Sequence, residues 1–201
     1  MSPPAGTLSA GASRRLARRA PLAVHPARGP AIKRNVHDFV VAAPADALAD
    51  ALGAVLADPG PIGAIEIKRR PDRVGKPFAV GERFHGCVHL LGALGRTRAG
   101  AWLEDTLASD YAEIVAMEPR RMVYRYLAGS PIAGQTTFLL EDHVPAGSRL
   151  RVIFEFQEIG GAAVTVLHRF GLRLHDQVTL AQVTRAAERL GVPLISSTLC
   201  R

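Results

Sequence analysis

Cysteine is scarce in this sequence. The 201 residues include two cysteines, Cys87 and Cys200. Two thiols exclude both the multiple-disulfide framework of small secreted domains and a zinc site with four thiolate ligands. Nothing in the sequence favours a bridge between the two, so we expect reduced thiols and a cytoplasmic protein.

Long apolar runs and recognisable catalytic motifs are also missing. No stretch of roughly 18 apolar residues occurs, so the sequence predicts no transmembrane helix. There is no glycine-rich phosphate loop, no nucleophile elbow and no clustered zinc-ligand spacing. We therefore predict no cofactor and no metal. A function, if the folded part has one, is expected in the apolar interior.

Acidic residues are absent from the first 34 residues, and the first carboxylate is that of Asp38. The same segment contains seven of the 25 lysines and arginines, so residues 35–201 contain 18 basic and 18 acidic side chains. The formal net charge of +7 therefore belongs to the N-terminal segment. Because the remainder is balanced, its composition gives no support for nucleic-acid binding.

Residues 1–34 are predicted to form a disordered basic arm. Prolines break any long helix there, and the absence of aromatic residues leaves little that could pack. Three interpretations remain open: a solvated tail or over-long start, an organelle transit peptide, or a tether to nucleic acid or anionic lipid. A transit peptide would place the protein in an organelle instead of the cytoplasm.

The pattern of the following residues predicts a domain of strands and helices. A β-branched run predicts a strand at 36–41, and apolar residues at helical spacing predict an amphipathic helix at 44–58. The charged residues 68–73 are expected to form a solvated loop. Alternating polar and apolar residues then predict antiparallel strands at 82–91, 111–117, 121–127, 135–141 and 150–157.

A long C-terminal helix follows the last of these strands. Apolar residues recur at helical spacing until Gly191 and Pro193, which are typical stop signals. The helix begins near Ala162 or, if a glycine-rich hairpin turn leads into one more strand, near Arg169. Residues 193–201 are expected to form a short C-terminal tail.

Three stretches of the chain carry a family resemblance. Residues 78–84 include a G-x-x-F motif at the start of a strand, residues 111–126 form a strand pair hinged at a Glu-Pro step, and residues 150–157 lead into the long helix. With this order of elements the chain resembles the START/Bet v 1-like superfamily, also called SRPBCC, from Val36 to Gly191; no subfamily is assigned. The resemblance implies an α+β helix-grip fold, in which a curved antiparallel β-sheet wraps around the C-terminal helix and residues 35–192 form a ligand-binding domain.

The resemblance also implies a hydrophobic cavity between the sheet and the C-terminal helix. Proteins of this superfamily bind lipids, sterols, polyketides or aromatic compounds, and some branches are polyketide cyclases or aromatases. The expected ligand-binding residues alternate onto the inner face of the strands or approach from the helix: Phe84, Met122, Tyr124, Tyr126, Phe138, Leu140, Phe154, Phe156, Phe170 and Leu174. The alternative is that the same side chains fill a solid core.

Histidines and one cysteine are the polar candidates. His85, Cys87 and His89 share a strand face that we expect to be exposed to solvent. The two histidines would lie about 13 Å apart on that strand, too far to share a metal ion. His168 and His175 are seven residues apart on the helix, where they are either acid–base groups or, as we prefer, polar residues at the edge of a packed helix.

Three functions follow from these observations. The first is the binding of a small hydrophobic ligand, such as a lipid, a polyketide or an aromatic compound. The second is a polyketide cyclase or aromatase that uses the same cavity, in which tyrosines or a histidine move protons. The third is an interaction module tethered by the basic arm. The sequence names neither the ligand nor the oligomeric state, and it leaves open whether the protein is an enzyme.

Overall fold

The computed structural model describes residues 6–22, 31–58, 60–62, 65–89, 97, 109–143, 145, 147–159 and 162–200. The side chains of residues 88, 162–172 and 174 lie outside this description. Two of the expected ligand-binding residues, Phe170 and Leu174, fall among them, as does His168.

Nine antiparallel strands form one sheet in the order β2-β3-β4-β5-β6-β7-β8-β1-β9. Each predicted strand is present, with bounds that differ by a few residues. The strands are β1 (Lys33–Val41), β2 (Pro61–Ile62), β3 (Ile65–Lys68), β4 (Arg83–Val88), β5 (Asp110–Glu118), β6 (Arg121–Tyr126), β7 (Ile132–His143), β8 (Gly147–Glu158) and β9 (Leu194–Cys200).

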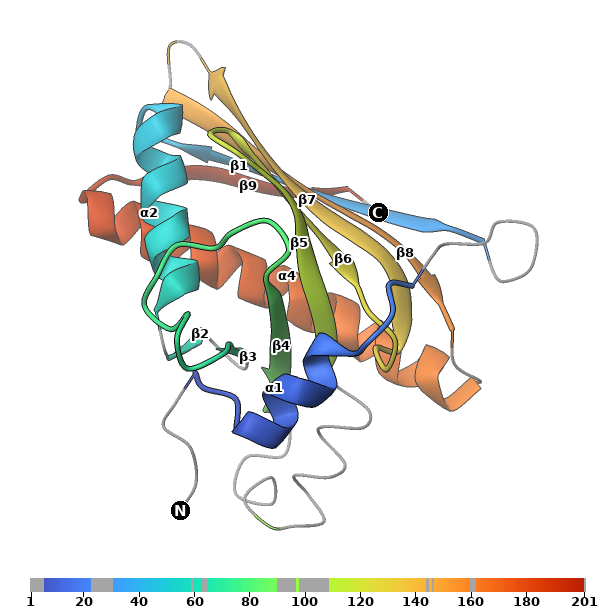
Figure 1. The fold of residues 1–201 in the computed structure, drawn as a ribbon. Coiled ribbons are helices and arrows are strands. Elements are labelled where there is room, and N and C mark those ends of the chain that lie inside the picture. Colours follow the sequence, from blue (N-terminus) through green and yellow to red (C-terminus); the bar gives the residue numbers. More distant parts are fainter. Residues whose placement is uncertain are drawn as a thin grey trace.

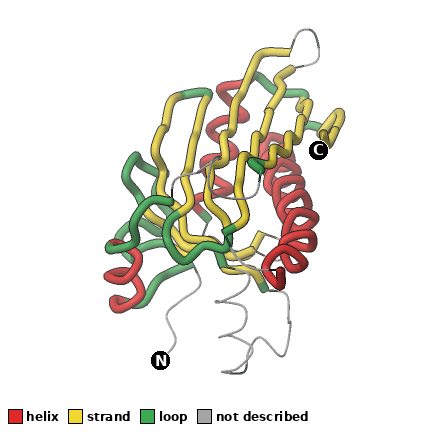
Figure 2. Tube along the Cα trace, turned by 90° about the vertical axis from the view of Figure 1, so that its right-hand side faces the viewer, coloured by secondary structure: helices red, strands yellow, loops and turns green. Residues whose placement is uncertain are grey.

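Two helices cover one face of this sheet, and the sheet curves around the longer of them (Figures 1 and 2). These helices are α2 (Ala45–Ala57) and α4 (Ala162–Leu190), so the long helix begins at the earlier of the two predicted positions. It ends where the sequence predicts, because Gly191 adopts a φ of 66° and its N–H bonds to the carbonyl of Glu188. The helix-grip fold is thereby confirmed.

The core lies between the inner face of the sheet and the two helices. Alternate residues of β1 and β8 are buried, and Phe39 and Leu150 have no accessible surface. They meet Leu48 of α2 and Val183 of α4 in a single apolar cluster. The spacing of apolar residues along α2 places them on one side of that helix. The periodicity therefore predicts both the helix and the side that it buries.

The N-terminal segment is ordered where the structure describes it, at residues 6–22, so the prediction of a disordered arm is wrong for these residues. Helix α1 (Ala10–Ala17) begins at Ser9, whose side chain caps it, and its Leu16 is 2% exposed. Leu16 packs with Leu8 and with Leu127, the residue that follows β6. A contact made by so few apolar side chains leaves no periodic signal in an arginine-rich segment.

The C-terminal residues form a strand instead of the predicted tail. Strand β9 pairs antiparallel with β1, with His37 opposite Leu199 and Phe39 opposite Ser197. The free edge of β1 offers unpaired backbone donors and acceptors, and β9 satisfies them. All but the first residue of β9 are exposed, so no buried stripe marks this strand in the sequence.

The charged stretch at residues 68–73 also differs from its prediction. Lys68 ends strand β3, and the side chain of Arg69 is only 2% exposed. Arg69 donates hydrogen bonds to the carboxylate of Glu82 and to the carbonyl of Lys76. The predicted solvated loop is therefore wrong for Arg69, because a carboxylate distant in the sequence satisfies its charge.

Candidate functional site

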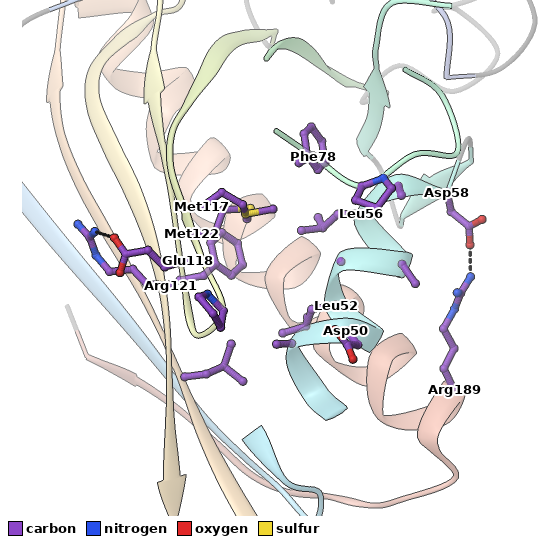
Figure 3. Close-up of a pocket in the computed structure, with 18 of the residues that line it drawn as sticks. Asp50, Leu52, Leu56, Asp58, Phe78, Met117, Glu118, Arg121, Met122 and Arg189 are labelled. Atoms are coloured by element: carbon purple, nitrogen blue, oxygen red, sulfur yellow. Dashed lines mark hydrogen bonds and ion pairs between the residues drawn. The ribbon is translucent and has the colours of Figure 1, made fainter. Parts of the chain in front are cut away.

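A pocket of about 680 Å³ lies between α2 and strands β5 to β7 (Figure 3). This volume falls within the roughly 300–1,000 Å³ that is usual for small-molecule sites. Its walls are mainly apolar, formed by Leu52, Leu56, Phe78, Met122, Phe138 and Leu140.

Small residues on α2 leave room for the pocket. Leu52 and Leu56 are one helical turn apart and point toward the sheet, while Ala49 and Gly53 present almost no side chain beside them. A Cβ atom built at Gly53 would meet no heavy atom within 4 Å. The wall of the pocket along α2 therefore carries no side chain at Gly53 and only a methyl group at Ala49.

Charged side chains lie around the pocket and do not fill it. Asp58, which follows α2, pairs with Arg189 in the last turn of α4, and this pair bridges the two helices. On the strand side, Glu118 and Arg121 form a pair at 2.9 Å. Figure 3 shows the two pairs on opposite sides of the apolar residues. The arrangement provides an apolar interior with a polar rim.

The expected ligand-binding residues divide between this pocket and the deeper inner face. Met122, Phe138 and Leu140 line the pocket. Phe84 packs edge-on against Phe78, a further pocket residue, with ring centroids 5.4 Å apart. The remaining described members, Tyr124, Tyr126, Phe154 and Phe156, belong to a separate aromatic cluster farther along the strands.

Tyr124 connects these two groups. Its ring centroid lies 5.4 Å from that of Phe84, 5.7 Å from that of Tyr126 and 6.2 Å from that of Phe138. Tyr124 is half-buried, whereas Tyr126 is 2% exposed. A row of aromatic rings therefore runs from the pocket to the buried end of β6.

Hydroxyl groups lie within this aromatic row. The Tyr126 Oη and Thr136 Oγ1 atoms are 3.3 Å apart, and both side chains are buried. Burial raises the pKa of Tyr126 well above its ordinary value, and burial raises that of Tyr124 as well. Both phenols therefore stay neutral at physiological pH and can donate a hydrogen bond.

Asp110 is an inner-face carboxyl that the sequence reasoning missed. Burial raises the pKa of this group to about 7. Asp110 is the first residue of β5. The strand predicted from the sequence began one residue later, at Tyr111, so Asp110 was not assigned to either face of it. Its negative charge also contributes to the raised pKa values of Tyr124 and Tyr126, which shows that the three groups are near one another.

The predicted solvent exposure of this strand face is wrong for His85 and Cys87, whereas His89 is exposed as predicted. His85 and Cys87 are 7% and 8% exposed, and the His85 ring stacks on Tyr111 with centroids 4.3 Å apart. The guanidinium group of Arg19, in the N-terminal segment, also lies over the Tyr111 ring. Its Cζ atom is 3.5 Å from the centroid of that ring. The N-terminal segment thus covers an outer face that would otherwise be solvated.

Within the described residues, no three His, Cys, Asp or Glu side chains are placed to hold a metal ion.

His175 and its neighbour Asp176 have separate surroundings. The His175 ring stacks on Phe154 with centroids 4.5 Å apart, so it contacts the inner aromatic cluster. Asp176 is buried and accepts a hydrogen bond of 2.9 Å from the Asn35 side chain. Asp176 therefore connects α4 to β1.

Along the described chain, no helix is long and apolar enough to span a membrane.

Comparison with known proteins gives similarity in structure only. No family sequence model matches the chain, and no curated protein matches it in sequence. An uncharacterized protein from Rhizobium leguminosarum aligns with a TM-score of 0.51 and 18% identity, over 79% of this chain and 97% of that one. Ara h 8.0201 aligns with a TM-score of 0.50 and 16% identity, over 78% of this chain and 99% of that one.

A third similar structure is the di-domain ARO/CYC protein StfQ from the steffimycin biosynthetic pathway. The TM-score is 0.53 at 14% identity, over 80% of this chain and 52% of StfQ, so the chain spans about half of that protein. Similarity at these levels of identity concerns the fold. Together with the sheet order and the long helix that the sheet encloses, it shows that the chain has a helix-grip fold, which is the fold that the resemblance to the START/Bet v 1-like (SRPBCC) superfamily implied.

Proposed function

We propose that the protein binds a small, mainly apolar molecule in the interior between the inner face of the sheet and helices α2 and α4. The observation that carries this proposal is the pocket of about 680 Å³, with its apolar walls and charged rim. The pocket opens to solvent between exposed residues such as Asp50 and Glu118, which gives a ligand a route of entry. The aromatic row that continues from Phe138 through Tyr124 favours a lipid, polyketide or aromatic ligand.

A cyclase- or aromatase-type enzyme that uses the same interior is the second candidate. It is favoured by the neutral Tyr126 hydroxyl beside Thr136, with Asp110 nearby on the same face. Such groups could exchange protons with a bound substrate. StfQ, named as an ARO/CYC protein, has the same fold and makes this class of reaction a reasonable one to assay.

The test uses Gly53, where the wall of the pocket has no side chain. Gly53→Phe would place a ring in the empty space, because nothing lies within 4 Å of the position of its Cβ. Gly53→Ala is the matched control, since it changes the helix backbone in the same way but adds only a methyl group. Binding of 1-anilinonaphthalene-8-sulfonate is measured by fluorescence titration, and co-purifying ligands are identified by native mass spectrometry.

We expect the alanine variant to bind the probe as the wild type does. The phenylalanine variant should bind at least about tenfold more weakly, which corresponds to roughly 1.4 kcal/mol. Its denaturation midpoint should remain near that of the wild type, which shows that the fold is retained. Equal probe affinity in all three proteins would contradict the assignment of this pocket as the binding site.

A further inference from the structure

Asp110 lies on the inner face of the sheet near the aromatic cluster. On β5, Ala112 and Ile114 are the alternate residues that follow it, and both are buried in the interior. Ala112 is paired with Tyr126, so Asp110 is two residues along β5 from the partner of that tyrosine. Because side chains alternate along a strand, the Asp110 carboxyl points to the same side as the Tyr126 ring.

A glycine lies beside this carboxyl. Gly86 of β4 is the register partner of Asp110 and occupies an inner-face position, two residues after Phe84. A Cβ atom at Gly86 would meet only the backbone oxygen and the Cβ of Asp110, at 3.7 and 3.9 Å. Glycine within a strand often marks a place where another group approaches closely. Asp110 accordingly keeps part of its accessible surface.

No charged group of the described chain pairs with Asp110. The titratable side chains that face it are Tyr124 and Tyr126 of β6, and both are neutral phenols. On β4 and β5, His85 and Tyr111 belong to the opposite face, beneath the N-terminal segment. From α4, His175 lies against Phe154. A carboxylate that is partly withdrawn from water and has no countercharge is costly, so a ligand cation would be favoured there.

We propose that Asp110 binds a protonated amine, so that the natural ligand is an apolar molecule carrying one basic nitrogen. This inference rests on the proposed function, because the apolar part of the ligand would lie in the interior, along the aromatic row that connects Tyr126 to Phe84 and Phe138. Asp110 itself does not line the pocket beside α2. The ammonium group supplies the countercharge that the described residues lack, in surroundings where an ion pair is only weakly screened. The nearby rings of Tyr124 and Tyr126 favour a cation further, through their negative faces.

The proposal has a consequence for pH. The amine binds the ionised carboxylate, and burial raises the pKa of Asp110 to about 7 in the free protein. At pH 6 only about a tenth of the molecules would be ionised, against about nine tenths at pH 8. The apparent Kd for an amine should therefore be about tenfold weaker at pH 6 than at pH 8. A neutral ligand of the same shape should show no such gain.

The experiment compares two probes of the same shape on the full chain. 1-Naphthylmethylamine is protonated throughout this pH range, and 1-naphthalenemethanol is neutral. Isothermal titration calorimetry at pH 6 and pH 8 measures both affinities for the wild type and for Asp110→Asn. We expect the wild type to prefer the amine at pH 8 and to lose about tenfold in amine affinity at pH 6. The asparagine variant should bind both probes alike at both pH values.

A second measurement on the wild type alone keeps the inference testable if the variant folds poorly. Binding of the amine near pH 7 should release protons, which appears as a difference in binding enthalpy between phosphate and Tris buffers. If the alcohol binds but the amine shows no preference, no pH dependence and no proton release, the role of Asp110 is wrong and the proposed function stands. If neither probe binds, both are wrong.

Discussion

The Arg69 guanidinium donates a hydrogen bond of 2.6 Å to Glu82, and both side chains are almost completely removed from solvent, at 2% and 5% exposure. Glu82 also accepts hydrogen bonds from Arg73 and from the backbone N–H of Ala79. The Arg69 Cζ atom lies 4.0 Å from the centroid of the Phe78 ring. Because Phe78 lines the pocket, this buried ion pair holds one of its walls.

Replacement of Arg69 should destabilise the protein strongly. Arg69→Met leaves the Glu82 carboxylate buried without its main partner, which typically costs about 3–5 kcal/mol of unfolding free energy. Urea denaturation measures the change. Arg70→Ala is the control, since Arg70 pairs with Asp72 at the surface, with both side chains more than half exposed, and should change stability by no more than about 1 kcal/mol. Similar losses in both variants would show that the burial of Arg69 has no energetic role.

Two glycines should respond in opposite ways to alanine. Gly134 in β7 has a φ of 139°, and a Cβ there would clash with the carbonyl oxygen of Glu155. Gly134→Ala should therefore lower the unfolding free energy by roughly 2–5 kcal/mol, through backbone strain and overpacking. Gly53→Ala in α2 should raise it by about 0.5–1 kcal/mol, because alanine is the better helix former. Chemical denaturation of the two variants decides, and a tolerated Gly134→Ala would contradict the described approach of β7 and β8.

The N-terminal segment should contribute to stability although it was predicted to be disordered. Leu16→Ala removes a side chain that is 2% exposed and packs against Leu8 and Leu127, so we expect a loss of about 2–3 kcal/mol. Hydrogen exchange should show faster exchange over residues 10–17. Arg14→Ala, at an exposed position of the same helix, should change stability by less than about 0.5 kcal/mol. A Leu16→Ala protein as stable as Arg14→Ala would mean that α1 does not pack on the sheet in solution.

Stability should depend on pH through Asp110. Burial raises the pKa of this carboxyl from 3.8 to about 7, so the folded protein binds its proton more tightly than the unfolded chain does. The stability associated with the neutral carboxyl is present below about pH 4 and is lost as the pH rises toward 7. Asp110→Asn should therefore stabilise the protein more at pH 8 than at pH 5, by on the order of 2 kcal/mol. Urea denaturation at both pH values provides the measurement, and an equal effect at the two would contradict the raised pKa.

Much of the fold could be predicted from the sequence because its signals are local. The apolar spacing of α2, with Leu48, Leu52 and Val55 on one side, and the alternation along β8 follow from the geometry of a helix and a strand. The end of α4 at Gly191 follows from the conformational freedom of glycine. Of the expected ligand-binding residues, Met122, Phe138 and Leu140 line the pocket, and their role in ligand binding stays a prediction.

Other features depend on partners that are distant in the sequence. Strand β9 forms because β1 has a free edge, the N-terminal segment is ordered because it covers the Tyr111 ring, and Arg69 is buried because Glu82 faces it. The sequence of each of these segments contains no pattern that identifies its partner. The sequence by itself determined α2, α4 and the strands β1 and β4 to β8, and which side of α2 and of these strands is apolar, since those depend on backbone periodicity. Only the tertiary structure decided where the empty volume lies and which charges are buried, because both depend on how far apart packed elements are held and on what meets across them.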